Sequence, residues 1–350
     1  MALVFLDGMD HLSGQQLPQK YDRGSVWFGF AEITAGGRFA STSMQNYTQG
    51  GPVWLGISTA TVSRILCGLG MATGSLPGAS VQFLRFMHES VQQVGVYYTS
   101  TKTLVLHCGS AGAVASYATS VFTNSSWNFI EMEAHWHSTA GSCTVYISDV
   151  QVVSFTGDTT NGVAATGFNQ ADWRIPNSGG AGTDYFNFDD FYVMDDQGSA
   201  NTTRVGSTAR IRTYHPSADV TVSMTPLVAG NNFSQVGDGA AGGVGWNTTT
   251  YNHASAVSTY DLYGMGSAAS SWSAAETPWG VQVTATALTI SGTAAIAVQL
   301  VVSGLQLITA SQALSTAYTR PHRLLAQTKP SGSAWEVSTM SAVRIGAGFA

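Results

Sequence analysis

The side chains that could carry out chemistry are concentrated in one segment, Trp127 to Phe155, with the sequence WNFIEMEAHWHSTAGSCTVYISDVQVVSF. Between Trp127 and His137 apolar and polar residues alternate, which predicts a β-strand with one apolar and one polar face. The apolar face carries Ile130, Met132, Ala134 and Trp136, and the polar face carries Glu131, Glu133, His135 and His137. That polar face could be catalytic, could hold a metal ion, or could face water or a neighbouring subunit.

Two metal sites can be drawn from the sequence. His135 and His137 point the same way on a strand and could share a zinc ion with Glu131 or Glu133, although no further ligand can be identified. A second group of carboxylates, Asp189, Asp190, Asp195 and Asp196, could bind calcium through oxygen atoms. Strand alternation makes Asp189 and Asp190 diverge, so Asp195 and Asp196 are the better pair, with turn capping as the alternative role. We expect no other cofactor.

Tryptophan rings could form platforms on which sugars stack. We expect Trp173 and Trp246 to lie in loops rich in glycine and asparagine, where an exposed ring could bind a glycan or anchor the loop. The chain has no G-x-S-x-G motif, no phosphate-binding loop and no Cys-x-x-Cys pair. Its three cysteines, Cys67, Cys108 and Cys143, lie in apolar contexts and are expected to be buried free thiols.

The composition restricts the class of protein. Only 10% of the 350 residues are charged, against about 25% in a typical soluble protein. So few charges favour a protein whose surface is covered by further copies of itself or by other proteins. The net charge of −6 argues against nucleic-acid binding. No apolar run is long enough to span a membrane, and Asp7 interrupts any signal-peptide core, so we expect synthesis in a cytoplasm.

Short strands separated by Gly, Ser and Thr recur along the chain, for example VQFLRFMHES, VGVYYTS and TLVLHC. Strands at intervals of about 8–12 residues are typical of a β-sandwich or jelly roll, and no convincing amphipathic helix is present. We therefore predict an all-β protein. Residues 157–182 are expected to form a long loop with at most one short strand. The composition changes after His215-Pro216, which predicts a first domain over residues 1–215 and a smaller β-sandwich domain over 216–350.

Several segments resemble known proteins. WNFIEMEAHWHSTAGSCTVYISDVQVVSFTGD, FNFDDFYVMDDQG and ARIRTYHP resemble the concanavalin A-like lectin/glucanase (LamG-like) jelly roll. DLYGM, TPWGVQVTATA, TAYTRPHRLL and AWEVSTMSAVRIG look like the end of large tailed-bacteriophage virion proteins that carry such a jelly roll. The glucanase resemblance implies acidic residues on alternate positions of one strand, but His135 replaces the third carboxylate, so the expected proton donor is missing.

From these observations we predict a non-enzymatic structural component of a tailed-bacteriophage virion, placed in a tail, tail tip or fibre, or as a capsid decoration or head fibre. Its expected partners are copies of itself and other virion proteins, and its expected location is the virion. The alternative is a carbohydrate-binding adhesin that recognises a host-surface glycan, through Trp173, Trp246, or the Glu131, Glu133 and His135 face. A glycan hydrolase built around Glu131 is the third hypothesis.

Overall fold

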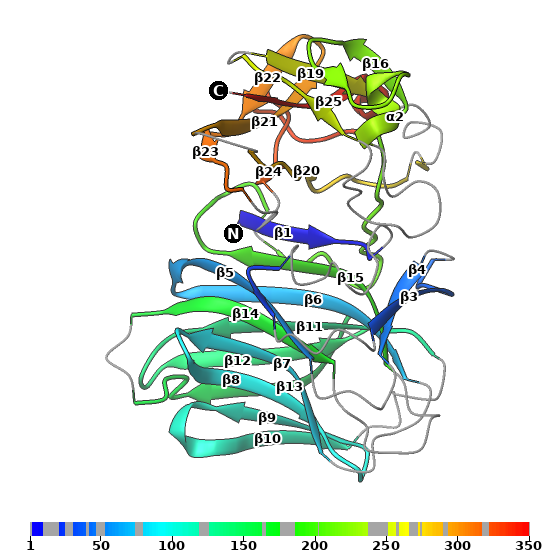
Figure 1. Cartoon of the computed structure of the whole chain (residues 1–350). Helices are drawn as coiled ribbons and strands as arrows, with labels where there is room; N and C mark the ends of the chain where they lie inside the picture. Colours follow the sequence, from blue (N-terminus) through cyan, green and yellow to red (C-terminus); the bar gives the residue numbers. More distant parts are fainter. Residues whose placement is uncertain are drawn as a thin grey trace. The chain divides into compact units, whose positions relative to one another are not determined.

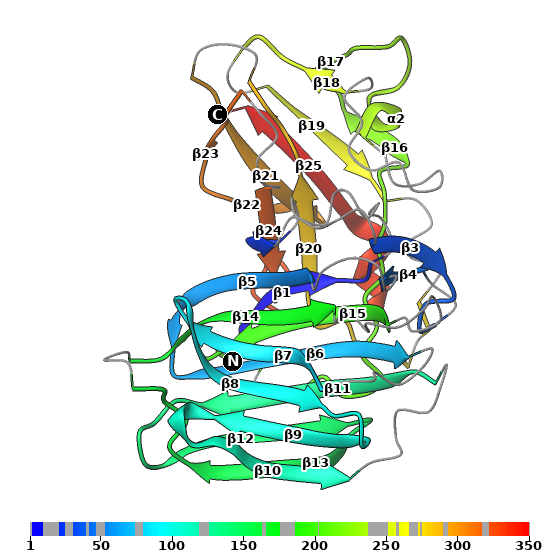
Figure 2. The same cartoon turned by 60° about the horizontal axis from the view of Figure 1, so that its bottom comes forward.

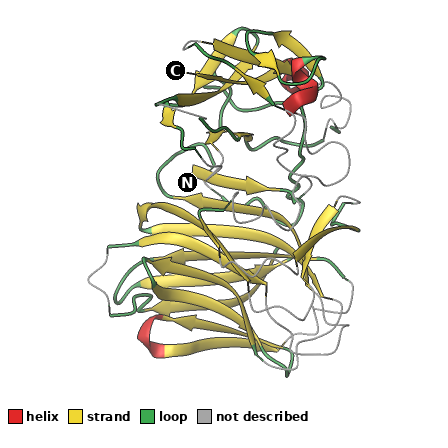
Figure 3. Ribbon diagram, viewed as in Figure 1, coloured by secondary structure: helices red, strands yellow, loops and turns green. Residues whose placement is uncertain are grey.

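A computed structural model shows that the chain folds into two compact units, Met1–Arg212 and Thr213–Ala350. The prediction placed the division near residue 216. The structure describes residues 2–9, 21–24, 31–39, 42–46, 53–73, 80–118, 126–162, 166–175, 186–201, 203–236, 251–256, 259–265, 272–273, 275–289, 293–316 and 322–349. Almost all regular structure in both units is β-strand (Figure 3), so the predicted all-β class is confirmed.

The first unit contains an eight-stranded antiparallel sheet, called here the first sheet. Its strands follow the spatial order β13-β12-β11-β6-β15-β4-β3, with β1 paired to β15 (Figure 1). Their bounds are β1 Ala2–Asp7, β3 Ala31–Ala35, β4 Thr42–Asn46, β6 Arg64–Thr73, β11 Asn128–His135, β12 Gly141–Ile147, β13 Val150–Gly157 and β15 Phe186–Asp195.

A seven-stranded antiparallel sheet, the second sheet, lies against the first (Figure 2). Its order is β10-β9-β8-β7-β14-β5-β2. The bounds are β2 Arg23–Gly24, β5 Val53–Val62, β7 Val81–His88, β8 Val91–Tyr98, β9 Thr103–Cys108, β10 Gly112–Ala118 and β14 Phe168–Ile175. β5 and β6 follow one another directly in the chain, and β-branched residues in this stretch favour the extended backbone.

The two sheets enclose one continuous apolar core. The predicted apolar face of β11 points into it: Ile130, Met132 and Ala134 are buried there, and the partly buried Trp136 packs against it. Opposite residues come from alternate positions of the second sheet, such as Val94, Val96 and Tyr98 of β8. Because side chains alternate along a strand, the remaining positions of each sheet point to its outer face. Those two outer faces carry the polar residues of interest. The three cysteines are free and buried, as predicted.

The second unit is built on a smaller antiparallel sheet of order β16-β19-β25-β21-β22, with β23 paired to β21. These strands are β16 Ala218–Thr221, β19 Thr259–Gly264, β21 Ala295–Val302, β22 Leu305–Ile308, β23 Gln312–Ala313 and β25 Val343–Phe349. Two short pairs accompany it, β17 Thr225–Pro226 with β18 Asn252–His253, and β20 Val281–Ala285 with β24 His322–Ala326. The buried carboxylate of Asp261 on β19 connects the main sheet to the segment before β17 and to the short helix α2 (Asn232–Val236), accepting hydrogen bonds from Ser223, Met224 and Asn232. Among the described residues, no helix has the length and apolar content needed to cross a membrane.

Candidate functional site

Glu131, the strongest catalytic candidate from the sequence, is sealed inside the protein. Its side chain is 1% exposed on the outer face of the first sheet. The carboxylate accepts hydrogen bonds from the Tyr192 hydroxyl and the Gly206 amide (2.9 Å), and it forms an ion pair with Arg204. Burial, followed by the nearby Glu131 charge, raises the pKa of Tyr192 well above its usual value. Internal partners therefore satisfy the Glu131 carboxylate, and its burial leaves it little surface for contact with a glycan.

Glu133 and His135 also bond to the protein itself. The Glu133 carboxylate lies 2.6 Å from Arg64 Nε and 3.2 Å from His135 Nε2. His137 accepts hydrogen bonds from the Thr139 and Ala140 amides through Nδ1, which closes the turn after β11. Within the described part of the chain, no group of three or more His, Cys, Asp or Glu side chains is placed to hold a metal ion. The zinc hypothesis therefore finds no third ligand there.

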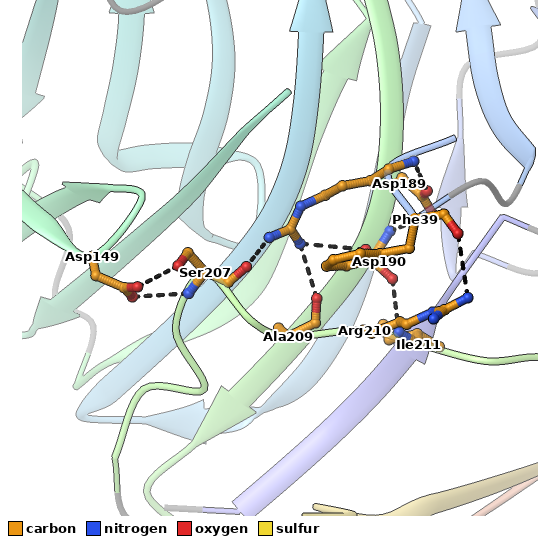
Figure 4. A network of polar contacts seen from close by, with 9 residues as sticks. Phe39, Asp149, Asp189, Asp190, Ser207, Ala209, Arg210 and Ile211 are labelled. Carbon is orange, nitrogen blue, oxygen red and sulfur yellow. Dashed lines mark hydrogen bonds and ion pairs between the residues drawn. The ribbon is translucent and has the colours of Figure 1, made fainter. Parts of the chain in front are cut away.

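A segment without regular strand structure, residues 203–212, contacts the outer face of the first sheet beside Glu131. Figure 4 shows Ser207 of this segment bonded to Asp149, and the Ile211 amide donating to Asp190 of β15. The Arg38 guanidinium donates hydrogen bonds to the Ser207 and Ala209 carbonyls and contacts Asp190 at 3.3 Å. The Arg38 backbone amide donates to Asp189. Hydrogen-bond donors of the protein itself thus occupy the carboxylates on this part of the outer face of the first sheet.

The same contacts correct the expected divergence of Asp189 and Asp190. The pairing of β15 with β6 shifts register between Asp189 and Tyr192, and Asp190 has a positive φ of 50°. This β-bulge breaks strict alternation. Both carboxylates consequently reach the same residue, Arg38. The expectation failed because a bulge leaves no clear mark in the sequence.

Asp195 and Asp196, the proposed calcium ligands, have separate structural roles. Asp195 is buried and accepts a hydrogen bond from the Gln197 amide. Burial raises the pKa of Asp195, and the nearby Asp196 charge raises it further. Asp196 accepts hydrogen bonds from the Ser63 and Arg64 amides. The pair therefore caps adjoining turns, the alternative role expected from the sequence, and among the described residues it belongs to no group of three or more potential metal ligands.

The two tryptophans predicted in loops have different outcomes. Trp173 belongs to β14, is 0% exposed and packs against Phe188 with ring centroids 4.8 Å apart. Its expected place in a loop is wrong, because the glycine-rich flanks obscured a strand, and its ring is buried in the core. Trp246 lies outside the described residues.

The outer face of the second sheet holds a set of polar and aromatic side chains that sequence reasoning missed. Its centre is Asp172 of β14, opposite Arg85 of β7 and Gly56 of β5. Arg85 donates to one oxygen of Asp172 from Nε (2.9 Å) and Nη2 (2.8 Å). The Arg85 guanidinium also lies 3.5 Å from the ring centroid of Trp54. A Cβ at Gly56 would collide with the Asp172 carboxylate, so this glycine makes room for the ion pair.

Arg174 lies on the same face, opposite Trp54 in the strand register. Its guanidinium is 5.2 Å from the Trp54 ring centroid, so two cations approach one indole. Arg174 Nε is buried and has no hydrogen-bond partner among the described residues. Burial lowers the pKa of Arg174, and the like charge of Arg85 lowers it further.

Next to these arginines, β8 and β9 add an aromatic pair. The rings of Tyr97 and His107 have centroids 4.3 Å apart, and both residues are partly exposed. Burial lowers the pKa of His107. Gly95, between them and Arg85 in the register, leaves space for the amides of Gln82 and Gln92, which bond to each other at 2.7 Å. The set of Trp54, Gln82, Arg85, Gln92, Tyr97, His107, Asp172 and Arg174 is called here the second-sheet face.

Comparisons with known proteins give a fold likeness only. No protein-family model matches the chain, and no curated protein matches it. Similar solved structures include the alginate lyase Aly36B, with 9% identity, 53% of this chain and 91% of that chain covered, and a TM-score of 0.41. An endo-β-1,4-glucuronan lyase from Trichoderma reesei has 11% identity, 55% and 96% coverage, and a TM-score of 0.41. A sialidase has 12% identity, 55% and 19% coverage, and a TM-score of 0.37.

These comparisons correct the function expected from the sequence. The proteins named above are lyases and a sialidase, which are enzymes that act on carbohydrates. The prediction of a non-enzymatic structural component of a phage virion is contradicted, and the phage resemblance receives no support. The lectin-like sandwich is retained. At these identities and TM-scores the likeness carries no argument about a ligand, which has to come from the chain's own residues.

Proposed function

We propose that the first unit binds a carbohydrate chain on the second-sheet face. The observation that carries the proposal is the gathering, on one sheet surface, of partly exposed aromatic rings and guanidinium groups, together with an amide pair, from β5, β7, β8, β9 and β14. Aromatic rings give sugars an apolar surface to stack on, and amides and guanidinium groups bond to hydroxyl and carboxylate oxygens. Ligand sites typically combine an apolar or aromatic surface with a few oriented polar groups, and this face has both.

The contrast with the first sheet supports this choice of face. Glu131, Asp149 and Asp190 there are met by Arg204, Ser207 and Arg38. On the second-sheet face, Arg174 keeps a buried donor without an acceptor among the described residues. A buried donor without a partner is unfavourable by about 1–3 kcal/mol. Arg174 as a whole is partly exposed, so a ligand can approach its charge.

The test is binding of the full chain to a panel of neutral and acidic polysaccharides by affinity electrophoresis, followed by calorimetry. Tyr97→Ala should weaken binding by about 10-fold, since stacking of this kind contributes about 1–1.5 kcal/mol. Tyr260→Ala is the matched control, because Tyr260 is a 44% exposed tyrosine of the second unit. Equal loss in both variants, or no binding to any polysaccharide, would refute the proposal.

A second candidate function is cleavage of the bound chain, favoured by the Tyr97 and His107 pair. Because burial lowers the pKa of His107, its imidazole is neutral at neutral pH and can accept a proton, while a phenol can donate one. Cleavage would appear as new reducing ends in the polysaccharide that binds. Loss of that product in His107→Gln at saturating polysaccharide, where weaker binding is overcome, is the expected signature.

A further inference from the structure

The charge balance of the second-sheet face indicates what kind of carbohydrate it accepts. Asp172 is the one carboxylate that the described residues place in the arginine cluster, and both of its oxygens are in use. Oδ2 accepts from Arg85, and Oδ1 accepts from the Gln170 amide. Of the two guanidinium groups whose side chains the structure describes on this face, one is therefore balanced within the protein. The other belongs to Arg174.

Arg174 is held in a position that disfavours an isolated cation. Burial and the positive charge of the neighbouring Arg85 both disfavour the protonated form of Arg174, and they lower its pKa. Its guanidinium stays in place beside the Trp54 ring, and its Nε–H has no acceptor in the described part of the chain. A neutral sugar hydroxyl would supply an acceptor and leave the charge unbalanced. A carboxylate would supply both the acceptor and the opposite charge.

We propose that the second-sheet face selects polysaccharides built from uronic acids, with Arg174 as the receptor of a sugar carboxylate and Arg85, fixed by Asp172, as the neighbouring positive charge. This inference rests on the proposed carbohydrate-binding function and specifies its ligand. The planar guanidinium fork matches the two coplanar oxygens of a carboxylate. The Tyr97 and His107 rings then lie where the sugar that carries the carboxylate, or its neighbour, can stack.

The test compares each acidic polysaccharide with its own neutral form. Polygalacturonate, alginate and glucuronan are each assayed against the same polymer after chemical reduction of its carboxyl groups, at about 0.15 M salt so that long-range attraction is screened. At least one acidic polymer should bind the full chain about 10-fold or more tightly than its reduced form. Arg174→Gln should abolish that difference. Arg210→Gln removes the same charge from the exposed Arg210 beside the first sheet and should leave the difference unchanged.

The outcomes separate the two proposals. Equal binding of acidic and reduced forms refutes the uronate inference and leaves carbohydrate binding intact. No binding to either form of any polymer refutes both. Poly-glutamate and dextran sulfate serve as further probes: binding of either one as tight as that of the best uronan refutes recognition of sugar carboxylates. Retention of the preference in Arg174→Gln, with the variant folded by circular dichroism, also refutes the assignment.

Discussion

The two outer faces of the first unit carry similar residue types and use them differently. On the first sheet the carboxylates outnumber the arginines, and backbone amides of the segment around Gly206 and Ile211 complete their hydrogen bonds. On the second-sheet face the arginines outnumber the carboxylates, and no described segment supplies an acceptor for Arg174 Nε. Polar residues on a strand therefore do not identify a site by themselves. A polar side chain is a better candidate for binding a ligand when the protein itself does not supply its hydrogen-bond or ion-pair partner.

The largest effect, on the free energy of unfolding, should come from breaking the buried polar contacts on the outer face of the first sheet. Glu131→Ala leaves the buried Tyr192 hydroxyl and Arg204 without their shared acceptor. Removing one partner of a buried ion pair decreases the free energy of unfolding by about 3 kcal/mol. Chemical denaturation measures this decrease in the free energy of unfolding. The matched change Glu133→Ala, at a more exposed pair with Arg64, should cost about 1 kcal/mol or less. Equal costs would show that Glu131 is not sealed as described.

Replacing Asp172, the carboxylate of the second-sheet face, should strengthen the binding of an acidic polysaccharide to that face. Asp172→Asn removes the negative charge and leaves Arg85 free to meet a ligand. We expect binding of the uronan identified above to tighten by about 3- to 10-fold, corresponding to about 0.7–1.4 kcal/mol. Calorimetry with the acidic and the reduced polymer measures the change. Weaker binding of the acidic form would indicate that Asp172 itself contacts the sugar.

Acid should weaken the polar contacts on the outer face of the first sheet before the apolar core unfolds. Burial alone would raise the pKa of Asp149, but hydrogen bonds from Ser207 and the charges of Arg204 and Arg38 lower it overall. The pKa values of Glu133 and Asp196 are also lowered, although burial again opposes the shift. Stability from such groups is fully present above their unfolded values of about 4 and is lost as pH falls through the lower folded values. Unfolding free energy should therefore fall steeply below about pH 4. Asp149→Asn should make that slope shallower.

The smallest effect should come from His107. Its pKa lies below the usual value of about 6.5, so protonation adds a positive charge to the second-sheet face only under mildly acidic conditions. A sugar carboxylate stays ionised there, so uronan binding should strengthen by about 2-fold as pH falls from about 7 to 5. Tyr97 is the titratable side chain seen in contact with the ring. His107→Gln should give a flat profile, and an unchanged profile would assign the titration elsewhere.

The sequence predicted the fold better than the site, for reasons visible in particular residues. Alternation identified β11 and its buried residues Ile130, Met132 and Ala134 because one strand carries that whole pattern. The second-sheet face draws one or two residues from each of five strands, and strand order cannot be read from alternation. Arg85 within VQFLRFMH was the available signal, since a lone arginine among buried apolar residues needs a partner.

The most direct test of the account observes the arginine side chains themselves. In ¹H–¹⁵N NMR spectra of the full chain, the Nε–Hε signals of Arg174 and Arg204 report on the two faces separately. Titration with the uronan that binds should shift the Arg174 signal in proportion to occupancy and leave the Arg204 signal, held by Glu131, in place. A shift of Arg204 with no change at Arg174 would contradict the assignment of the ligand to the second-sheet face.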